Sequence, residues 1–302
     1  MEIFEILSPS GREENMISYI KAFGESQGYK CNTDVFGNLI CEKGDGKIAV
    51  ECGVDSVALM KIGETDSGMI KVSVPSSKEV SSLVGKKVKF LNGVVGVVRC
   101  DKTENIEDSD LNIDIGETDK EGTKEKVPMG EFATLCADIT ENEKFIFGNG
   151  ISVYAPIITA LEVMKNADDT AFLFTTQKKF AGRGLKALLG GYEADTVISI
   201  NTIPEKDEVK CTEGAVVIIK EKGAVPTEKV RKALIKAGGE KVQVGVTEDN
   251  LFLDLPLICG KGALTGGVCI GVRDKGKAYE GIAKADIKSA AELILNYINK
   301  VN

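Results

Sequence analysis

The sequence predicts an α/β fold in which helices cover both faces of a β-sheet and a small β domain is inserted. In residues 1–60 and 138–302, apolar strand-like runs alternate with amphipathic helical patterns. Residues 61–137 instead contain short β-like runs separated by Gly, Asn and Ser. At 302 residues and 43% hydrophobic side chains, the chain is long enough for a large core and a smaller second one.

The first segment predicts a helix that leads into the sheet. Ser10 is the expected N-cap of an amphipathic helix over residues 11–29. The apolar positions of this helix recur at helical spacing: Met16, Ile17, Ile20 and Phe23. Residues 36–44 and 46–54 then predict two strands joined by a Gly-Asp-Gly turn.

The middle segment predicts strands at 69–75, 86–92 and 93–100, and no helix of core length apart from a turn near 76–83. We therefore expect a discontinuous main domain, 1–60 plus 138–302, and an inserted β domain at 61–137.

In the last segment, helical and strand patterns alternate again. Helices are expected at 151–167, 183–191, 226–238 and 283–300, and strands at 170–177, 195–201, 215–223 and 266–272.

Composition excludes several classes of function. A net charge of −8 opposes binding to a phosphate backbone, so nucleic acid is not an expected partner. The N-terminus lacks a charged start followed by an apolar run, and no eighteen consecutive residues are apolar, which predicts a cytoplasmic protein without membrane association. The eight cysteines are scattered and favour reduced, mostly buried thiols over a zinc or redox site.

There is no histidine in the chain. This excludes Ser-His-Asp and Cys-His catalysis, histidine-ligated zinc and an imidazole acid or base. The remaining chemistry must use carboxylates, lysine, thiols, hydroxyls or the backbone. Two adjacent lysines, Lys178 and Lys179, follow the buried strand FLFTT in the stretch FLFTTQKKFAGRG, where an α/β enzyme often places its site.

The chain resembles metallopeptidase family forty-two, the glutamyl, deblocking or tetrahedral aminopeptidases, over nearly its whole length. The stretches that carry the likeness are SPSGREE, DVFGNLI, CGVDSVALM, DLNIDIGETDKEGTKEKVPMGEF, TTQKKFAGRG and GVRDKGKAYEGIAKADI. The resemblance implies a mixed sheet, an insertion that helps to pair subunits, and a two-metal site in active members. The hollow dodecamer known in the family does not follow from this sequence.

The expected metal-binding side chains are replaced, except for one aspartate. The His-x-Asp segment of the family falls on Gly53 and Asp55, its bridging Asp on Asn149 and its Glu-Glu pair on Lys178 and Lys179. The later Asp falls on Asn201 and the last His on Gly276, because Arg273 and Glu280 match the residues that flank it. Thr247 and Glu248 are a loose match to a Gly-Thr-Asp segment of the family.

Zinc requires anionic or imidazole donors, which glycine, asparagine and protonated lysine do not supply. A divalent ion about 4 Å from an ammonium meets roughly 8 kcal/mol of repulsion at an effective dielectric of about 20. We therefore expect no metal, no cofactor and no catalytic residues at these positions. We further hypothesise that one lysine ammonium occupies the vacated metal position and pairs with Asp55.

Other interpretations remain open at this point. Lys178 and Lys179 could be ordinary surface lysines, or one could act as a base or Schiff-base former. Glu51 and Asp55 could be a carboxylate pair for glycoside hydrolysis, and Cys52 could be a nucleophile, although no histidine could activate it.

The leading functional hypothesis is a catalytically degenerate homologue of dinuclear metallo-aminopeptidases. It would act as a non-catalytic partner or regulatory subunit in a homo-oligomer or in a mixed oligomer with an active relative, or as a peptide-binding protein. The alternative is an active hydrolase, an aminopeptidase or related peptidase or glycosidase, with an unorthodox site. A purely structural protein would instead have a cleft filled by packed side chains.

Overall fold

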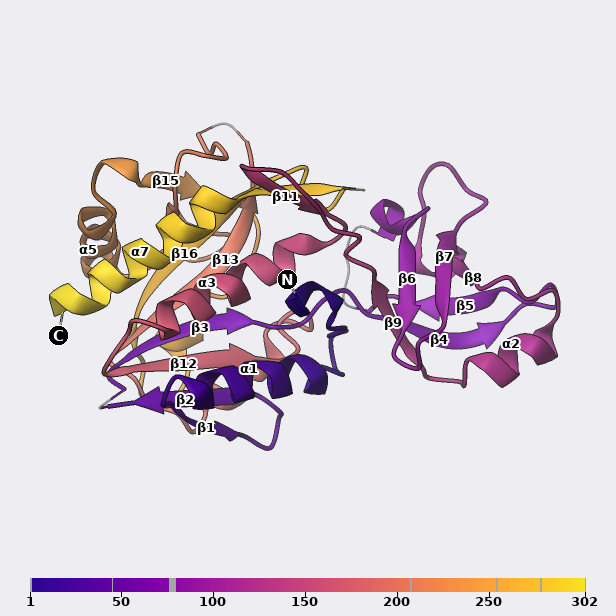
Figure 1. Cartoon of the computed structure of the whole chain (residues 1–302), viewed down its shortest axis with the longest axis horizontal. Coiled ribbons are helices and arrows are strands. Elements are labelled where there is room, and N and C mark those ends of the chain that lie inside the picture. Colours follow the sequence, from indigo (N-terminus) through magenta and orange to yellow (C-terminus); the bar gives the residue numbers. More distant parts are fainter. Residues whose placement is uncertain are drawn as a thin grey trace.

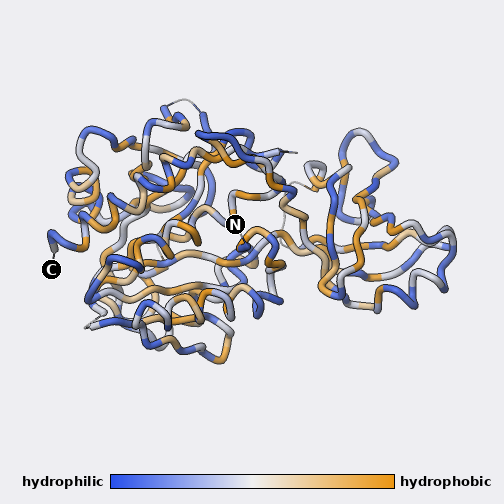
Figure 2. The backbone as a smooth tube through the Cα atoms, in the orientation of Figure 1, coloured by the Kyte–Doolittle hydropathy of each residue, from blue (hydrophilic) through white to orange (hydrophobic). Residues whose placement is uncertain are grey.

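The computed structural model describes residues 2–44, 46–75, 80–206, 208–253, 255–277 and 279–301. Two bodies make up this part of the chain: a large helix-covered sheet and a small barrel beside it (Figure 1). Hydrophobic residues concentrate along the central strands and hydrophilic ones on the outer loops (Figure 2). Among the described residues, no helix has both the length and the apolar character needed to cross a bilayer.

The large sheet is mixed and has eleven strands in the described part of the chain. Its spatial order is β1 (Lys30–Thr33), β2 (Leu39–Lys43), β12 (Thr170–Thr175), β3 (Ile48–Gly53), β13 (Thr196–Pro204), β16 (Leu264–Arg273), β17 (Glu280–Ala283), β11 (Phe145–Gly148) and β10 (Thr140–Glu141). β14 (Val216–Lys220) branches from β16 and pairs with β15 (Gln243–Val246). The four strands β12, β3, β13 and β16 are parallel to their neighbours in this group, so their carboxyl ends meet at one edge.

Helices cover both faces of this sheet, as predicted. The core on one face includes side chains from α1 (Glu14–Ser26), α3 (Tyr154–Met164), α5 (Glu228–Gly238) and α7 (Lys284–Val301). The other face packs against α4 (Arg183–Leu189) and α6 (Leu255–Ile258). The strand β12 is buried on both faces, which explains its apolar sequence. Phe172 and Phe174 enter the first core, while Ala171 and Leu173 enter the second.

Six strands close the small barrel in the order β4 (Leu59–Glu64), β5 (Ile70–Ser73), β8 (Asn112–Asp114), β7 (Val95–Arg99), β6 (Lys87–Phe90) and β9 (Phe132–Leu135). Inward residues such as Val72, Val88, Phe90 and Ile113 form a separate core. The barrel also contains the short helix α2 (Lys120–Lys126), in the acidic and lysine-rich stretch that follows DLNIDIG. The expected turn near 76–83 begins outside the described residues and ends as the 3-10 turn Val80–Leu83.

Two local predictions were wrong. Ser10 does not cap α1: the helix starts at Glu14 after Glu13, and the Ser10 hydroxyl donates to Asp55 instead. The strands β2 and β3 are consecutive in sequence but are not neighbours, because β12 lies between them, antiparallel to β2 and parallel to β3. The Gly-Asp-Gly turn includes residue 45, which lies outside the described residues.

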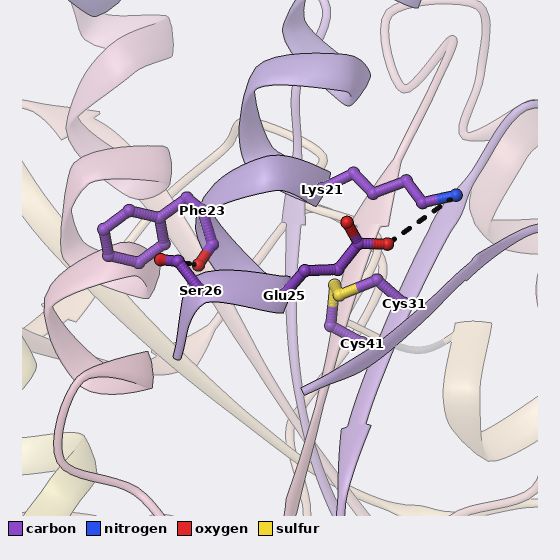
Figure 3. The surroundings of a disulfide bond; sticks show 6 residues. All are labelled: Lys21, Phe23, Glu25, Ser26, Cys31 and Cys41. Atoms are coloured by element: carbon purple, nitrogen blue, oxygen red, sulfur yellow. Dashed lines mark hydrogen bonds and ion pairs between the residues drawn. A yellow bond between two sulfur atoms is a disulfide. The ribbon is translucent and has the colours of Figure 1, made fainter. Parts of the chain in front are cut away.

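One cysteine pair also differs from the expectation of reduced thiols. Cys31 and Cys41 face each other across the antiparallel pair β1 and β2 and form a disulfide beneath α1 (Figure 3). Their Cα atoms are 4.1 Å apart. The six other cysteines are free thiols. The spacing of the cysteines does not predict this bond, because strand register places the two residues opposite each other.

Candidate functional site

A cavity lies at the carboxyl ends of the parallel strands, next to the barrel. Its volume is about 720 Å³, and its walls include Gly53 at the end of β3, Asn201 in β13 and Pro75 after β5. The register explains this convergence: Thr175 of β12 lies beside Gly53, and Ser199 of β13 lies beside Glu51. This is the edge at which α/β sheets place their ligands.

Five of the seven positions that match the family's site line this cavity: Gly53, Asp55, Lys178, Lys179 and Asn201. Asn149 and Gly276 lie close by without lining it. Asn149 precedes the 3-10 turn Ile151–Val153, and Ser152 of this turn lines the cavity. The Glu280 carboxylate accepts from the backbone N–H of Ser152 and from that of Gly276, both at 2.7 Å, and thereby ties the Gly276 loop to this turn.

Lys178 forms a buried ion pair, but with Glu51 and not with Asp55. Its Nζ donates to Oε1 and Oε2 of Glu51 at 3.1 and 3.0 Å. The side chain of Lys178 is 11% exposed and that of Glu51 is fully buried. The Thr175 hydroxyl adds a 2.7 Å hydrogen bond to Oε1. The carboxylate therefore has a counter-ion and accepts three hydrogen bonds in all, as a buried charge requires.

Asp55 has different partners, which corrects the hypothesised pairing with a lysine ammonium. Its Oδ2 accepts from the Ser10 hydroxyl and from the backbone N–H of Lys179, both at 2.8 Å. Lys179 is itself exposed, and its ammonium forms no ion pair within the described part of the chain. Of the two lysines, only Lys178 is therefore built into the core. The hypothesis of two ordinary surface lysines is wrong for Lys178.

A second carboxyl group lies near Asp55. Glu13 is buried, and its Oε1 accepts from the backbone N–H groups of Gly11 and Gln177, both at 2.8 Å. Burial raises the pKa of Glu13 to about 7, with a smaller contribution from the negative charge of Asp55 and opposition from the backbone hydrogen bonds. The carboxyl joins the SPSGREE segment to the chain that follows β12.

These residues do not fit a pair of divalent cations. Gly53 and Gly276 have no side chain to donate, and the Lys178 ammonium is held at Glu51. The buried Oδ1 of Asn149 accepts no hydrogen bond from any described residue, but one neutral amide oxygen is a weak ligand without anionic neighbours. Nowhere in the described ranges do three His, Cys, Asp or Glu side chains form a group suited to a metal.

The other candidate residues are not arranged for catalysis. Cys52 is buried, and desolvation raises the pKa of its thiol, with the charge of Glu51 adding to the shift, so that a thiolate is disfavoured. Glu51 and Asp55 have separate partners, Lys178 for the first and Ser10 for the second, and only Asp55 lines the cavity. Glu248 pairs with Lys220 at the surface, and the Thr247 hydroxyl accepts from the backbone N–H of Asp249.

Sequence reasoning missed the role of Glu51 and much of the cavity wall. A glutamate within the buried strand IAVECG is itself a signal, because a charge at such a position needs a partner. The loop at 249–252 contributes four consecutive residues to the wall, and Arg183 and Lys275 add two cations. No pattern in the sequence placed these segments beside Lys178.

Comparison with known proteins agrees with this architecture. The sequence profile of the M42 glutamyl aminopeptidase family matches residues 37–293. A curated protein of Acetivibrio thermocellus named "Putative aminopeptidase" is 26% identical and aligns over 97% of this chain and 95% of its own.

Solved structures share the fold. The TET aminopeptidase of a marine sediment archaeon, Thaumarchaeota archaeon, superposes with a TM-score of 0.91 at 16% identity, covering 100% of this chain and 96% of its own. The TET1 peptidase of Pyrococcus horikoshii, which assembles into a tetrahedron or a large octahedral shell, gives 0.84 at 22% identity, with 98% and 96% covered. The chain belongs to the M42 glutamyl aminopeptidase family.

Proposed function

We propose that this protein is a catalytically degenerate member of its family that serves as a non-catalytic subunit or as a peptide-binding protein. The observation that supports this most directly is the Lys178–Glu51 ion pair, with two N–O distances of 3.0 and 3.1 Å. In the family's pattern, Lys178 takes the place of a glutamate expected to act as general base. Here an ammonium occupies that position and is neutralised by a carboxylate of the neighbouring strand.

The second part of the proposal concerns the open cavity. A purely structural protein would be expected to fill its old cleft with side chains, whereas about 720 Å³ remains open beside Asp55 and Asn201. That volume suits a small ligand or the end of a peptide. The cavity therefore favours retained binding over a purely architectural role.

We also propose that the chain works as an oligomer, either of identical copies or mixed with an active relative. The small barrel corresponds to the insertion that pairs subunits in the family, and Ile62 and Met129 on it are exposed apolar side chains. Native mass spectrometry of the protein isolated from its own cells distinguishes the two assemblies. A strictly homomeric population would contradict the mixed one. A cytoplasmic location stays a prediction.

The decisive test is metal content. The purified protein is incubated with zinc, cobalt and manganese, desalted thoroughly and measured by elemental mass spectrometry, with an active family member treated in parallel. We expect less than about 0.1 metal per chain for this protein, because the residues at the site offer too few anionic donors. About two metals per chain would overturn the proposal and revive the peptidase hypothesis.

The alternative, a metal-independent hydrolase with an unorthodox site, has one observation in its favour. Burial raises the pKa of Glu13 to about 7, and this carboxyl group lies near Asp55, which lines the cavity. Turnover of a panel of aminoacyl and peptide substrates tests it. Activity that disappears in the Lys178→Ala variant and persists in Lys186→Ala, on the exposed side of α4, would favour this alternative.

A further inference from the structure

The ionic lining of the cavity is unbalanced. Four cationic side chains, those of Lys178, Lys179, Arg183 and Lys275, line it together with the carboxylates of Asp55 and Asp249. Two of the cations already have carboxylate partners: Lys178 binds Glu51 at 3.0 Å, and Lys275 lies 3.4 Å from Asp249. Lys275 also donates to the carbonyl oxygen of Thr202 at 2.7 Å.

The other two cations have no carboxylate partner within the described ranges. The Lys179 side chain makes no ion pair there, and Asp55 accepts from the backbone N–H of Lys179 instead. The Arg183 guanidinium lies over the ring of Phe180, 5.1 Å from its centroid, and has no ion pair in this part of the chain. Asn201 adds a further donor, since its Nδ2 has no hydrogen-bond partner among the residues that the structure describes. Donors are therefore in excess at this end of the sheet.

An excess of charged donors in a concave site favours an anion. Asp55 and Asp249 limit how negative that anion can be, because each repels a second negative charge. A carboxylate carries a single negative charge. It is attracted to the cations of the lining and is repelled less by Asp55 and Asp249 than a phosphate dianion would be. The rest of the wall is mixed, and the partly exposed apolar side chains of Val153 and Phe252 are available to pack against side chains of a ligand.

We propose that this cavity binds peptides by their C-terminal carboxylate, which Lys179 and Arg183 receive. The inference rests on the peptide-binding form of the proposed function and specifies which end of the peptide enters. The ammonium end of a peptide would meet four cations there. The carboxylate end meets Lys179 and Arg183, which have no carboxylate partner among the described residues, while the adjoining side chains pack on Val153 and Phe252.

Isothermal titration calorimetry of the full chain at pH 7 tests this. The probes are N-acetyl-Ala-Ala-Phe with a free carboxylate, the same peptide with a C-terminal amide, and inorganic phosphate. We expect the free acid to bind at least about tenfold more tightly than the amide, because a charge-assisted pair is lost. Lys179→Met and Arg183→Gln should each weaken binding of the free acid by about tenfold. Both replaced side chains are exposed, so these variants should fold normally.

Lys186→Met is the matched control, because Lys186 is exposed on the same helix α4 and is outside the cavity wall. Its affinity for the free acid should equal that of the unmodified chain. Equal binding of acid and amide, binding of phosphate alone, or absence of binding to all three probes would each overturn the proposal. Metal content, measured on the same preparation, tests the proposed loss of the metal site independently of the peptide-binding result.

Discussion

Gly53 leaves the space that the stem of Lys178 occupies. A Cβ atom on Gly53 would lie 2.5 Å from Cδ and 2.9 Å from Cβ of Lys178. By the resemblance, the two residues are expected at the positions of the family's first metal-binding histidine and of one of its glutamates. Positions 53 and 178 are thus sterically linked, because a side chain at position 53 would collide with the stem through which Lys178 reaches Glu51. A reversion of one position alone would not restore the site.

The first prediction follows from that contact. Gly53→Ala should lower the free energy of unfolding by about 1 to 3 kcal/mol, because the added methyl group overpacks a site that cannot expand. The control is Gly191→Ala, since a Cβ there meets no atom within 4 Å. Urea denaturation of both variants measures the effect. Equal stability of the two variants would show that Lys178 can move aside.

The second prediction concerns the Lys178–Glu51 pair itself. Lys178→Met leaves the fully buried Glu51 carboxylate without its counter-ion and should reduce stability by about 3 to 5 kcal/mol. The double variant Glu51→Gln with Lys178→Met should lose clearly less than the sum of the two single variants. A double-mutant cycle from urea denaturation gives the coupling energy.

Lys179→Met provides the control for this cycle, because Lys179 is the exposed neighbour and should change stability by less than about 0.5 kcal/mol. Additive single effects, with no coupling between Glu51 and Lys178, would contradict an ion pair that supports the core. Equal losses in Lys178→Met and Lys179→Met would mean that the adjacent lysines share one environment.

The α/β fold could be predicted because its signals are local or periodic. The apolar β12 strand, the helical spacing in α3 and α7, and the β-like runs of the barrel all follow from side-chain patterns. The order of the strands within the sheet could not be predicted from these patterns. The insertion of β12 between β2 and β3 depends on pairing across more than a hundred residues, and no local pattern encodes it.

The site was predicted in part for a similar reason. The buried strand before Lys178 and the resemblance that singled out Asp55 placed both residues at one edge of the sheet, but neither could say which carboxylate each lysine meets. The choice of Glu51 depends on side-chain direction: Glu51 lies inside β3, two residues before Gly53, on the side that Lys178 reaches. The partner of Asp55 is the hydroxyl of Ser10. The sequence pattern predicts Ser10 as a helix N-cap and does not indicate this long-range hydrogen bond.

A third prediction addresses the disulfide between Cys31 and Cys41. The bond closes a short loop between β1 and β2, and its reduction should lower the free energy of unfolding by about 2 to 3 kcal/mol. The variant with Cys31→Ser and Cys41→Ser should be insensitive to reductant. Alkylation of the unreduced, unfolded protein should label six of the eight cysteines. Labelling of all eight would mean that the two thiols are reduced in solution.

The last prediction is a pH dependence that originates at Glu13. The pKa of this carboxyl rises from 4.5 to about 7 on folding, mainly because burial disfavours its charged form. The folded state therefore binds more protons than the unfolded state between these values, and stability must fall as pH rises through them. Its full penalty, at most about 3 kcal/mol, is reached above pH 7.

Glu13→Gln removes this penalty while its amide oxygen can still accept from the N–H groups of Gly11 and Gln177. The variant should therefore gain stability over the unmodified chain as the pH is raised from 5 to 8. Urea denaturation at both pH values measures this difference directly. Glu14→Gln is the control, because that neighbouring side chain is 75% exposed and should show no such gain. A constant difference across the two pH values would place the titration of Glu13 outside this range.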